Sequence, residues 1–318
     1  MNIFLNRLSK PARLVAMSVL IVAAFAVLAA GCGTNGEVGD GGTVSTTQPS
    51  ETTTTTTASP SSTTTTAPPD DTTTTSTTSA EETTTVKVYF SRDEKISAAS
   101  RTIPRTQEVG AAAMRALLAG PTDAETEAGM FSSIPEGTTF LGLAINDGVA
   151  TVDLSKEYSS GGGSLSMMMR LAEVVFTLTQ FPTVDGVEFK LDGEPIDVLG
   201  GEGIIIDHPM TRADYEDMSP AILVESPALG DTVTSPVRVT GTANVFEAVF
   251  SINIVDWDGL IIADEVVTAT SGTGTRGTFD VTVPFELTKA GPGAIIVFAE
   301  SPKDGSQINV VEIPVELE

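Results

Sequence analysis

Between Val86 and Gly193, apolar residues recur first at steps of two and then at steps of three and four, which predicts strands interleaved with helices. The first strand covers 86–90, and a polar loop is expected to follow it to Pro104. The further elements expected here are a helix capped by Thr106 that ends before Gly120, a short helix over 122–129 with the Thr122-x-x-Glu125 spacing of a capping box, strands over 139–145 and 149–154 joined by Asn146-Asp147-Gly148, a helix containing Leu165 and Thr179, and a strand over 187–191. The order β-α-(α)-β-β-α-β predicts an α+β domain over 86–218, in which helices cover one sheet.

From Ser219 onward the pattern changes to short strands separated by turns, with no helical period. Seven strands at these intervals predict an all-β immunoglobulin-like sandwich over 219–318. The antibody-type disulfide is excluded because the only cysteine of the chain is Cys32, so packing must depend on apolar burial. The expected strands cover 222–225, 237–242, 249–255, 260–267, 277–283, 294–299 and 308–315.

The first 32 residues are typical of an exported lipoprotein. A basic start with Arg7, Lys10 and Arg13 precedes an uncharged apolar run over 14–30. The run ends in Leu28-Ala29-Ala30-Gly31-Cys32, which resembles the bacterial lipobox, where the cysteine thiol receives diacylglycerol before cleavage. We therefore expect a signal peptide over 1–31 and a membrane anchor of acyl chains such as palmitate on Cys32. The alternative is an uncleaved transmembrane anchor, although the run is short for about 30 Å of hydrocarbon.

A threonine-rich segment follows the cysteine, and 22 of the 43 residues from Thr43 to Thr85 are threonine. Such a composition buries too little apolar surface to offset the entropy of ordering, so a disordered linker is expected over 32–85. Two interpretations remain open, an unmodified spacer and an O-glycosylated stalk.

The net charge of the chain argues against two classes of partner, nucleic acid and anionic lipid headgroups. The chain has 42 acidic and 17 basic residues, a formal net charge of −25. This excess of acid disfavours nucleic acid, whose binding needs clustered Lys and Arg. It also repels anionic headgroups, so lipid on Cys32, rather than the protein surface, is expected to provide the contact with the membrane.

The residues do not assemble a catalytic set. The acidic pairs Asp93-Glu94, Glu216-Asp217 and Asp264-Glu265 are interpreted as solvated edges rather than as the paired carboxyls of a glycosidase. Neither Ser164 nor Ser166 lies in a Gly-x-Ser-x-Gly elbow, and His208, the only histidine, is expected in a surface loop. We expect no enzyme activity, no cofactor and no metal.

The segment 256–259 has two interpretations, a calcium loop and a hairpin turn. Asp256-Trp257-Asp258-Gly259 has the core of a calcium loop, but its flanks are strands and Ile254 occupies the place of the first ligand, so a hairpin turn is favoured. Trp257, the only tryptophan, is a candidate contact for a partner or a wall sugar, although we expect it to be partly buried in the sandwich.

Short motifs in both parts carry a family resemblance. The first domain resembles the sporulation and spore-germination family called GerMN, through the segments Val88-Tyr89-Phe90, Ala116-Leu117-Leu118-Ala119-Gly120-Pro121-Thr122, Ile134-Pro135-Glu136-Gly137-Thr138, Ala150-Thr151-Val152-Asp153-Leu154-Ser155 and Leu191-Asp192-Gly193. The second resembles the immunoglobulin-like domain of bacterial spore germination, through Ser226-Pro227, Ser235-Pro236-Val237, Val239-Thr240-Gly241-Thr242-Ala243 and Phe246-Glu247.

The resemblance implies a lipoprotein of the cell envelope. The lipobox predicts that it lies on the extracytoplasmic face of the cell membrane, and the threonine-rich segment is typical of a Gram-positive-type envelope. Relatives in endospore formers serve spore envelope assembly or germination, related domains also occur in bacteria that form no spores, and the fold is similar to domains that pack into rings. Together with the sequence, this predicts a non-catalytic interaction or assembly module whose partners are envelope proteins or further copies of itself. The alternatives are a lipoprotein that binds or remodels wall polymer such as peptidoglycan, and an accessory to a membrane sensor kinase.

Overall fold

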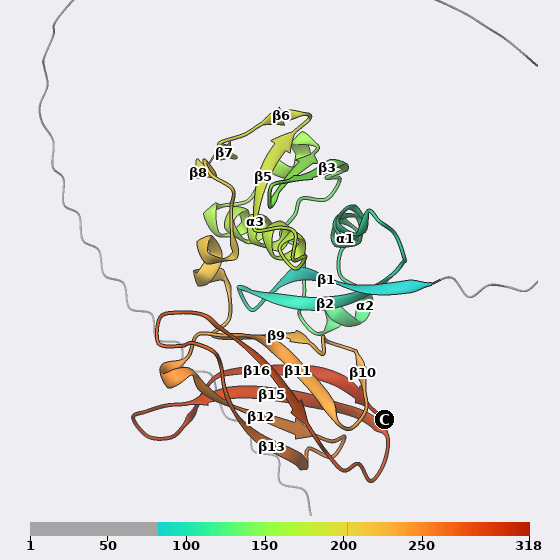
Figure 1. Cartoon of the computed structure of the whole chain (residues 1–318), viewed down its shortest axis with the longest axis vertical. Coiled ribbons are helices and arrows are strands. Elements are labelled where there is room, and N and C mark those ends of the chain that lie inside the picture. The colour runs from blue at the N-terminus through green and yellow to red at the C-terminus, as the bar shows by residue number, and fades with distance from the viewer. Residues whose placement is uncertain (1–81, 202) are drawn as a thin grey trace, which may run out of the picture. The chain divides into compact units, whose positions relative to one another are not determined.

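The computed structural model describes residues 82–201 and 203–318, which contain two large hydrophobic cores (Figure 1). One core lies in the α+β half, residues 83–218, and also includes Leu223; the other lies in the β-sandwich half, residues 222–317. The signal peptide expected over 1–31, Cys32 and the expected linker up to residue 81 lie outside the described residues. The linker was expected to reach residue 85, but residues 83–85 already belong to the first strand.

The described chain begins with a hairpin of two long strands, β1 (Thr83–Arg92) and β2 (Lys95–Pro104), which pair antiparallel along their whole length. The polar loop expected up to Pro104 is therefore wrong. Its turn is Asp93-Glu94, and both residues have positive φ, 51° and 59°. A two-residue hairpin turn of this kind usually contains Gly or Asn, so the sequence carried no turn signal here.

Two helices follow the hairpin. Helix α1 (Val109–Leu118) begins after Glu108, so Thr106 lies before its N-cap and accepts the Glu108 amide instead. Helix α2 (Asp123–Glu127) starts with the expected capping box, in which the Thr122 hydroxyl accepts the Glu125 amide and the Glu125 carboxylate accepts the Thr122 amide. The capping box is confirmed.

A four-stranded sheet completes the α+β half. The strands β3 (Phe140–Asn146) and β4 (Val149–Leu154) form the expected hairpin, and helix α3 (Ser164–Leu178) connects β4 to the parallel strand β5 (Gly186–Leu191). The order of the sheet is β3-β4-β5-β6. The remaining short elements are η1 (Lys156–Ser159), β6 (Glu194–Pro195), β7 (Val198–Leu199), β8 (Ile204–Ile205) and η2 (Arg212–Met218).

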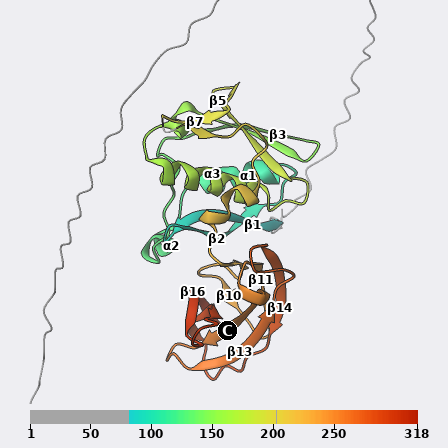
Figure 2. The same ribbon diagram turned by 90° about the vertical axis from the view of Figure 1, so that its left-hand side faces the viewer.

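The helices lie between two sheets rather than on one. Helices α1 and α3 contact β1 on one side, and on the other they contact β3 and β5 respectively (Figures 1 and 2). The α+β class is as expected, but the strand β2 and the second sheet were not anticipated, because β2 alternates small and polar residues that look like a loop.

All seven strands expected in the second half are present. They pack as a sandwich of a five-stranded sheet, β10-β16-β15-β12-β13, and a three-stranded sheet, β14-β11-β9. Between the sheets, Phe250 and Phe279 meet edge to face with ring centroids 4.8 Å apart. The elements are β9 (Ile222–Ser226), β10 (Thr232–Val233), β11 (Val237–Ala243), η3 (Phe246–Ala248), β12 (Val249–Val255), β13 (Ile261–Thr268), β14 (Gly277–Val283), β15 (Gly291–Glu300) and β16 (Gln307–Leu317).

No helix in the described part of the chain combines the length and the apolar character needed to cross a membrane.

Candidate interaction site

Three strand edges meet where the two halves of the molecule adjoin. Strand β2 is one edge of the two-stranded sheet, and β9 is one edge of the three-stranded sheet. Strand β16 pairs with β10 only at Glu316 and Leu317, so its stretch over 307–313 has a strand neighbour on one side alone among the described residues. Unpaired backbone groups on such edges are a template for another extended chain.

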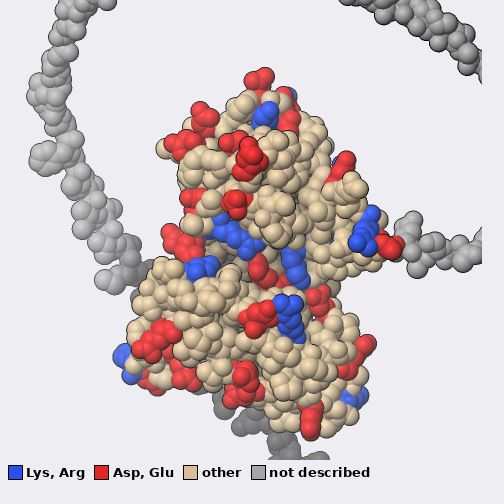
Figure 3. Space-filling view, in the orientation of Figure 1, with Lys and Arg blue, Asp and Glu red and all other residues tan. Residues whose placement is uncertain are grey.

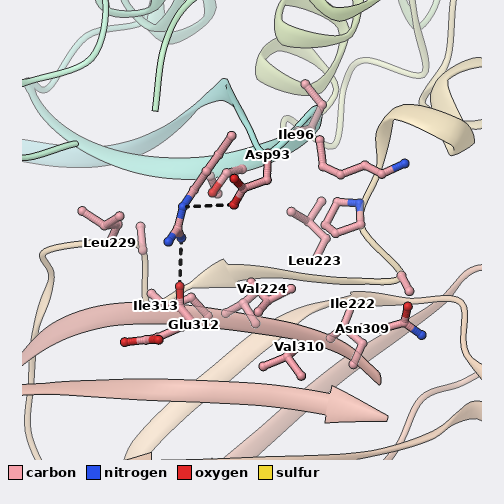
Figure 4. A pocket seen from close by; sticks show the side chains of 18 of the residues that line it. Asp93, Ile96, Ile222, Leu223, Val224, Leu229, Asn309, Val310, Glu312 and Ile313 are labelled. Atoms are coloured by element: carbon pink, nitrogen blue, oxygen red, sulfur yellow. Dashed lines mark hydrogen bonds and ion pairs between the residues drawn. The ribbon is translucent and has the colours of Figure 1, made fainter. Parts of the chain in front are cut away.

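These edges border a partly open, mainly apolar cavity of about 260 Å³. Figure 4 shows Ile96 on β2 above the cavity, and Leu223, Val224 and Val310 on β9 and β16 below it. Ile96 and Leu223 are buried, whereas Val310 is 52% exposed and lies at the mouth. A cavity of this size is slightly smaller than the roughly 300–1,000 Å³ of sites for small molecules and cofactors, so it suits apolar side chains of a partner chain.

Charged residues border the apolar lining. Arg92 donates from Nη1 to the backbone carbonyl oxygen of Glu312 at 2.8 Å, and its Nε lies 4.0 Å from Asp93 Oδ2 (Figure 4). Lys95 donates to the carbonyl oxygen of Asp217 at 2.6 Å. The backbone carbonyl of Glu312 accepts this hydrogen bond from Arg92, so it points away from β15 and toward the cavity. Backbone groups on the outer side of an edge strand have this orientation.

A polar cluster holds the two halves together behind the cavity. Arg212, on η2, donates to Glu225 of β9 at 2.7 Å and to the hydroxyl of Tyr89 at 3.2 Å, and Tyr89 itself donates to Glu225. The guanidinium also lies 4.7 Å from the ring centroid of Phe176. Burial raises the pKa of Tyr89 above its ordinary value, so the hydroxyl stays protonated and able to donate.

Further polar contacts cross the same junction. Lys87 donates to the hydroxyl of Ser100 at 2.9 Å, and this hydroxyl donates to Asp231 at 3.0 Å. Burial lowers the pKa of Lys87 from its ordinary value. Arg276 of the sandwich donates to Glu216 of η2 at 2.8 Å. In Figure 3 the basic side chains gather where the two halves meet, although the chain as a whole is acidic. The junction is therefore a specific, charge-paired contact.

Trp257 is not among the residues that line this cavity and lies in the turn between β12 and β13. Trp257 is 53% exposed, so nearly half of it is buried, and the ammonium of Lys289 lies 5.0 Å from the ring centroid. The Asp256 carboxylate accepts the amides of Asp258 and Leu260, each at 3.0 Å, so this carboxylate organises a hairpin turn. No group of three metal-ligating side chains gathers anywhere within 82–201 and 203–318.

The acidic pairs considered from the sequence fall in different places. Asp93-Glu94 forms the β1–β2 turn, and Asp264-Glu265 lies exposed on β13. Glu216 is not a solvated edge as expected, because Arg276 and Asn244 both donate to its carboxylate. This ion pair and the amide hydrogen bond lower the pKa of Glu216.

The histidine and the two serines considered for a triad do not come together. His208 is exposed in a loop, as expected, with Nδ1 3.1 Å from Asp207 and Nε2 3.4 Å from Asp214. Ser166 lies on α3, where Arg170 donates to its hydroxyl at 3.4 Å. Ser164 begins that helix.

The residues of the cavity were missed by the sequence reasoning. The strand β2 was interpreted as a loop, so an edge at Ile96 was not foreseen. One signal was present in β16, where Ile308, Val310 and Val311 place apolar side chains on both faces of the strand. Such a strand needs cover on both faces.

Comparisons with known proteins agree with this architecture. A family model described as sporulation and spore germination matches residues 87–197, and a model described as the immunoglobulin-like domain of bacterial spore germination matches residues 221–306. A comparison with curated protein sequences finds no match.

Two solved structures with similar regions come from Bacillus subtilis. The first GerMN domain of the sporulation protein GerM is 23% identical, with a TM-score of 0.36 over 41% of this chain and 99% of that one. The tandem GerMN domains of the same protein are 16% identical, with a TM-score of 0.37 over 74% of this chain and 61% of that one.

Proposed function

Because residues 87–197 belong to the sporulation and spore germination family and residues 221–306 to the immunoglobulin-like domain of bacterial spore germination, we propose that this chain is a non-catalytic interaction module of the bacterial cell envelope. It acts on the outer face of the cell membrane and is tethered there by lipid on Cys32. Its role is to hold another envelope protein in place during an assembly step linked to sporulation or germination.

One observation carries the proposal: three strand edges surround an apolar cavity at the junction of the two halves. An extended segment of a partner adds to the open edge of β16 and places alternate apolar side chains into the cavity. In strand addition of this kind, main-chain hydrogen bonds provide affinity and side-chain pockets provide selectivity. The paired charges behind the cavity keep its two walls at a constant spacing, so the site is formed before the partner arrives.

Site-specific photocrosslinking in living cells tests the binding site. A photoreactive residue at position 310 of the full, anchored chain is expected to crosslink to one segment of an envelope protein, which mass spectrometry of the joined peptides identifies. Val310→Asp puts a charged carboxylate where an apolar side chain of the partner would pack, and crosslinking from a photoreactive residue at 309 should then fall at least tenfold. Val266→Asp is the matched control, because Val266 is also an exposed valine of the sandwich but lies on β13.

Equal crosslinking in both aspartate variants overturns the binding site. The identity of the segment found at position 310 also separates the partners: a structural envelope protein fits an assembly role, and the extracytoplasmic part of a sensor kinase fits an accessory role.

The anchor has its own test. Cys32→Ser removes the thiol that receives the lipid, so the protein should leave the membrane fraction and lose incorporation of an alkyne-labelled palmitate. A variant that keeps the label on the membrane-bound protein contradicts the anchor but leaves the binding site untouched.

A second function, binding of wall polymer, has one specific observation in its favour. The indole of Trp257 is more than half exposed at the end of a hairpin, which suits stacking on a sugar ring. Cosedimentation with purified peptidoglycan distinguishes the two functions. Binding that Trp257→Ala abolishes and Val310→Asp preserves favours the wall polymer, and the opposite loss of protein crosslinking favours the interaction module.

A further inference from the structure

Strand β3 differs from the other edge strands of the structure. From Thr138 to Asn146 the sequence is Thr-Thr-Phe-Leu-Gly-Leu-Ala-Ile-Asn, with no charge and no proline. Edge strands usually carry charged residues or proline, because these residues prevent pairing with other chains. All the other described edge strands longer than two residues carry charged residues. These are Lys87 and Arg92 on β1, Lys95 and Arg101 on β2, Glu225 on β9, Asp264 and Glu265 on β13, and Asp280 on β14.

The free edge of β3 is also apolar. Leu141 is 51% exposed and Ile145 is 41% exposed, while Leu143 between them is half-buried against α1. Within the described residues β3 pairs with β4 alone, regularly from Gly142 to Asn146. Because the chain has a net charge of −25, nine consecutive uncharged residues on an open edge indicate a surface that binds a partner.

The helix beside this edge shows which partner fits. The guanidinium of Arg115, in the last turn of α1, lies 5.3 Å from the ring centroid of Phe140, which begins β3. A Cβ on Gly110, in the first turn of α1, would lie 2.9 Å from Cδ2 of Leu143, so α1 runs back along β3 and its start, which Glu108 precedes, lies toward the Ile145 end of the strand. A positive charge therefore flanks the start of the strand and a negative charge flanks its end.

This arrangement is complementary to itself. If a second copy pairs antiparallel about an axis beside Leu143, Leu141 of one copy faces Ile145 of the other, and Leu143 faces Leu143. The same two-fold rotation places Arg115 of each copy near Glu108 of the other copy, so the interface has two contacts between opposite charges. A two-fold interface of this kind uses one surface on both copies and closes on itself, so it makes a dimer rather than a fibre.

We propose that β3 is a self-association edge through which two copies of this chain join their four-stranded sheets into one continuous sheet, aligned by the charges of Glu108 and Arg115. The proposal does not depend on the cavity between the two halves, which lies on other elements. Anchoring both copies to one membrane raises their local concentration and favours the pairing.

A disulfide on the axis tests the register. Leu143→Cys should give a covalent dimer when cells carrying the full, anchored chain are oxidised, because directly opposed residues of antiparallel strands have Cα atoms about 4.5–5.5 Å apart, within the range of a disulfide. The control is Val266→Cys, an exposed position on the edge strand β13. Dimer at or below the level of this control, from Leu143→Cys protein that is folded by circular dichroism, overturns the proposal.

Charge reversal provides a second test that does not disturb the core, since Glu108 and Arg115 are both exposed. Arg115→Glu replaces two attractive contacts by two repulsive ones, so we expect the detergent-solubilised dimer to dissociate roughly tenfold more readily. The double variant Glu108→Arg with Arg115→Glu restores opposite charges and should recover dimerisation. Failure of the double variant to recover, or a chain that stays monomeric at all concentrations, excludes the two-fold pairing.

Discussion

Arg212 and Glu225 form an ion pair across the junction of the two halves, with Nη1 of the guanidinium 2.7 Å from Oε1 of the carboxylate. Both side chains are about three-quarters buried, at 26% and 23% exposure, and Tyr89 shares the contact. A pair held this way is strong only while both partners remain, because removing one leaves an uncompensated charge.

The first prediction concerns this pair. Arg212→Met should lower the free energy of unfolding by about 2 kcal/mol, less than for a fully buried pair because water still reaches both groups. It should also let the two halves melt as separate transitions in calorimetry. Arg238→Met is the control, because the pair of Arg238 with Asp280 is largely exposed and should leave the transition unchanged. One transition, at the wild-type temperature, in Arg212→Met would show that the pair does not couple the halves.

The second prediction is a pH dependence caused by Glu173, on α3. Burial raises the pKa of Glu173 to about 7, although the hydroxyls of Ser91 and Ser132 and the amide of Ser133 donate to its carboxylate. A carboxyl whose pKa is higher in the folded protein than in the unfolded chain binds its proton more tightly when folded. Its contribution is therefore most favourable below the unfolded pKa, about 4.5, and is lost as the pH rises to about 7.

Denaturant unfolding between pH 4.5 and pH 8 measures this effect. Relative to Glu173→Gln, which keeps the shape and an acceptor oxygen but does not titrate, the wild type should lose about 3 kcal/mol across this interval. Subtracting the variant removes the contribution of the other titrating groups. A constant difference between the two proteins at all pH values would contradict the raised pKa.

The third prediction concerns His208. Hydrogen bonds that the imidazole donates to Asp207 and Asp214 raise the pKa of His208 above its ordinary value. The protonated imidazole is favoured in the folded protein, so any stabilisation is present below the ordinary pKa and disappears as the pH rises through the folded one. Because the chain has one histidine, a single imidazole signal in proton NMR reports this titration directly.

Asp207→Asn should lower the pH at the midpoint of that titration, because Asp207 contributes most to the raised pKa and the substitution removes its charge. Asp280→Asn, on the sandwich, should not move it. A midpoint at the value of a free histidine in the unaltered protein would show that the loop does not hold these groups together.

The fourth prediction tests the start of α2. Thr122→Ala removes the hydroxyl that accepts the Glu125 amide, so the free energy of unfolding should fall by about 1 kcal/mol. Thr106→Ala is a matched comparison, because Thr106 looks like a cap in the sequence but lies before the N-cap of α1. A larger loss from Thr106→Ala than from Thr122→Ala would reverse the assignment of the two caps.

Local chemistry explains which elements were foreseen. The hairpin from β3 to β4 has Asp147-Gly148 at its turn, both residues with positive φ, and the glycine makes this conformation visible in the sequence. The hairpin from β1 to β2 turns at Asp93-Glu94 with the same sign of φ but without a glycine, so the second strand was interpreted as a loop. Tertiary contacts hold that turn where local propensity does not.

The same distinction applies to the candidate sites. Trp257 was selected because of its residue type, yet its exposure depends on how far the β12–β13 turn extends beyond the sheet. Val310 and Ile96 are ordinary apolar residues in the sequence. They became part of a candidate site only because edges of three different sheets come together around them.

The sequence by itself determined the fold class of both halves, the seven strands of the sandwich and the capping box, because hydrophobic period, turn residues and caps act over a few positions. It also carried the expectation of a lipid on Cys32, which lies outside the described residues. Only the tertiary structure decided that the helices lie between two sheets, that Arg212 meets Glu225, and that β3 presents a bare edge. Each of these depends on contacts between residues far apart in the chain, and no local pattern encodes which distant edges and charges will meet.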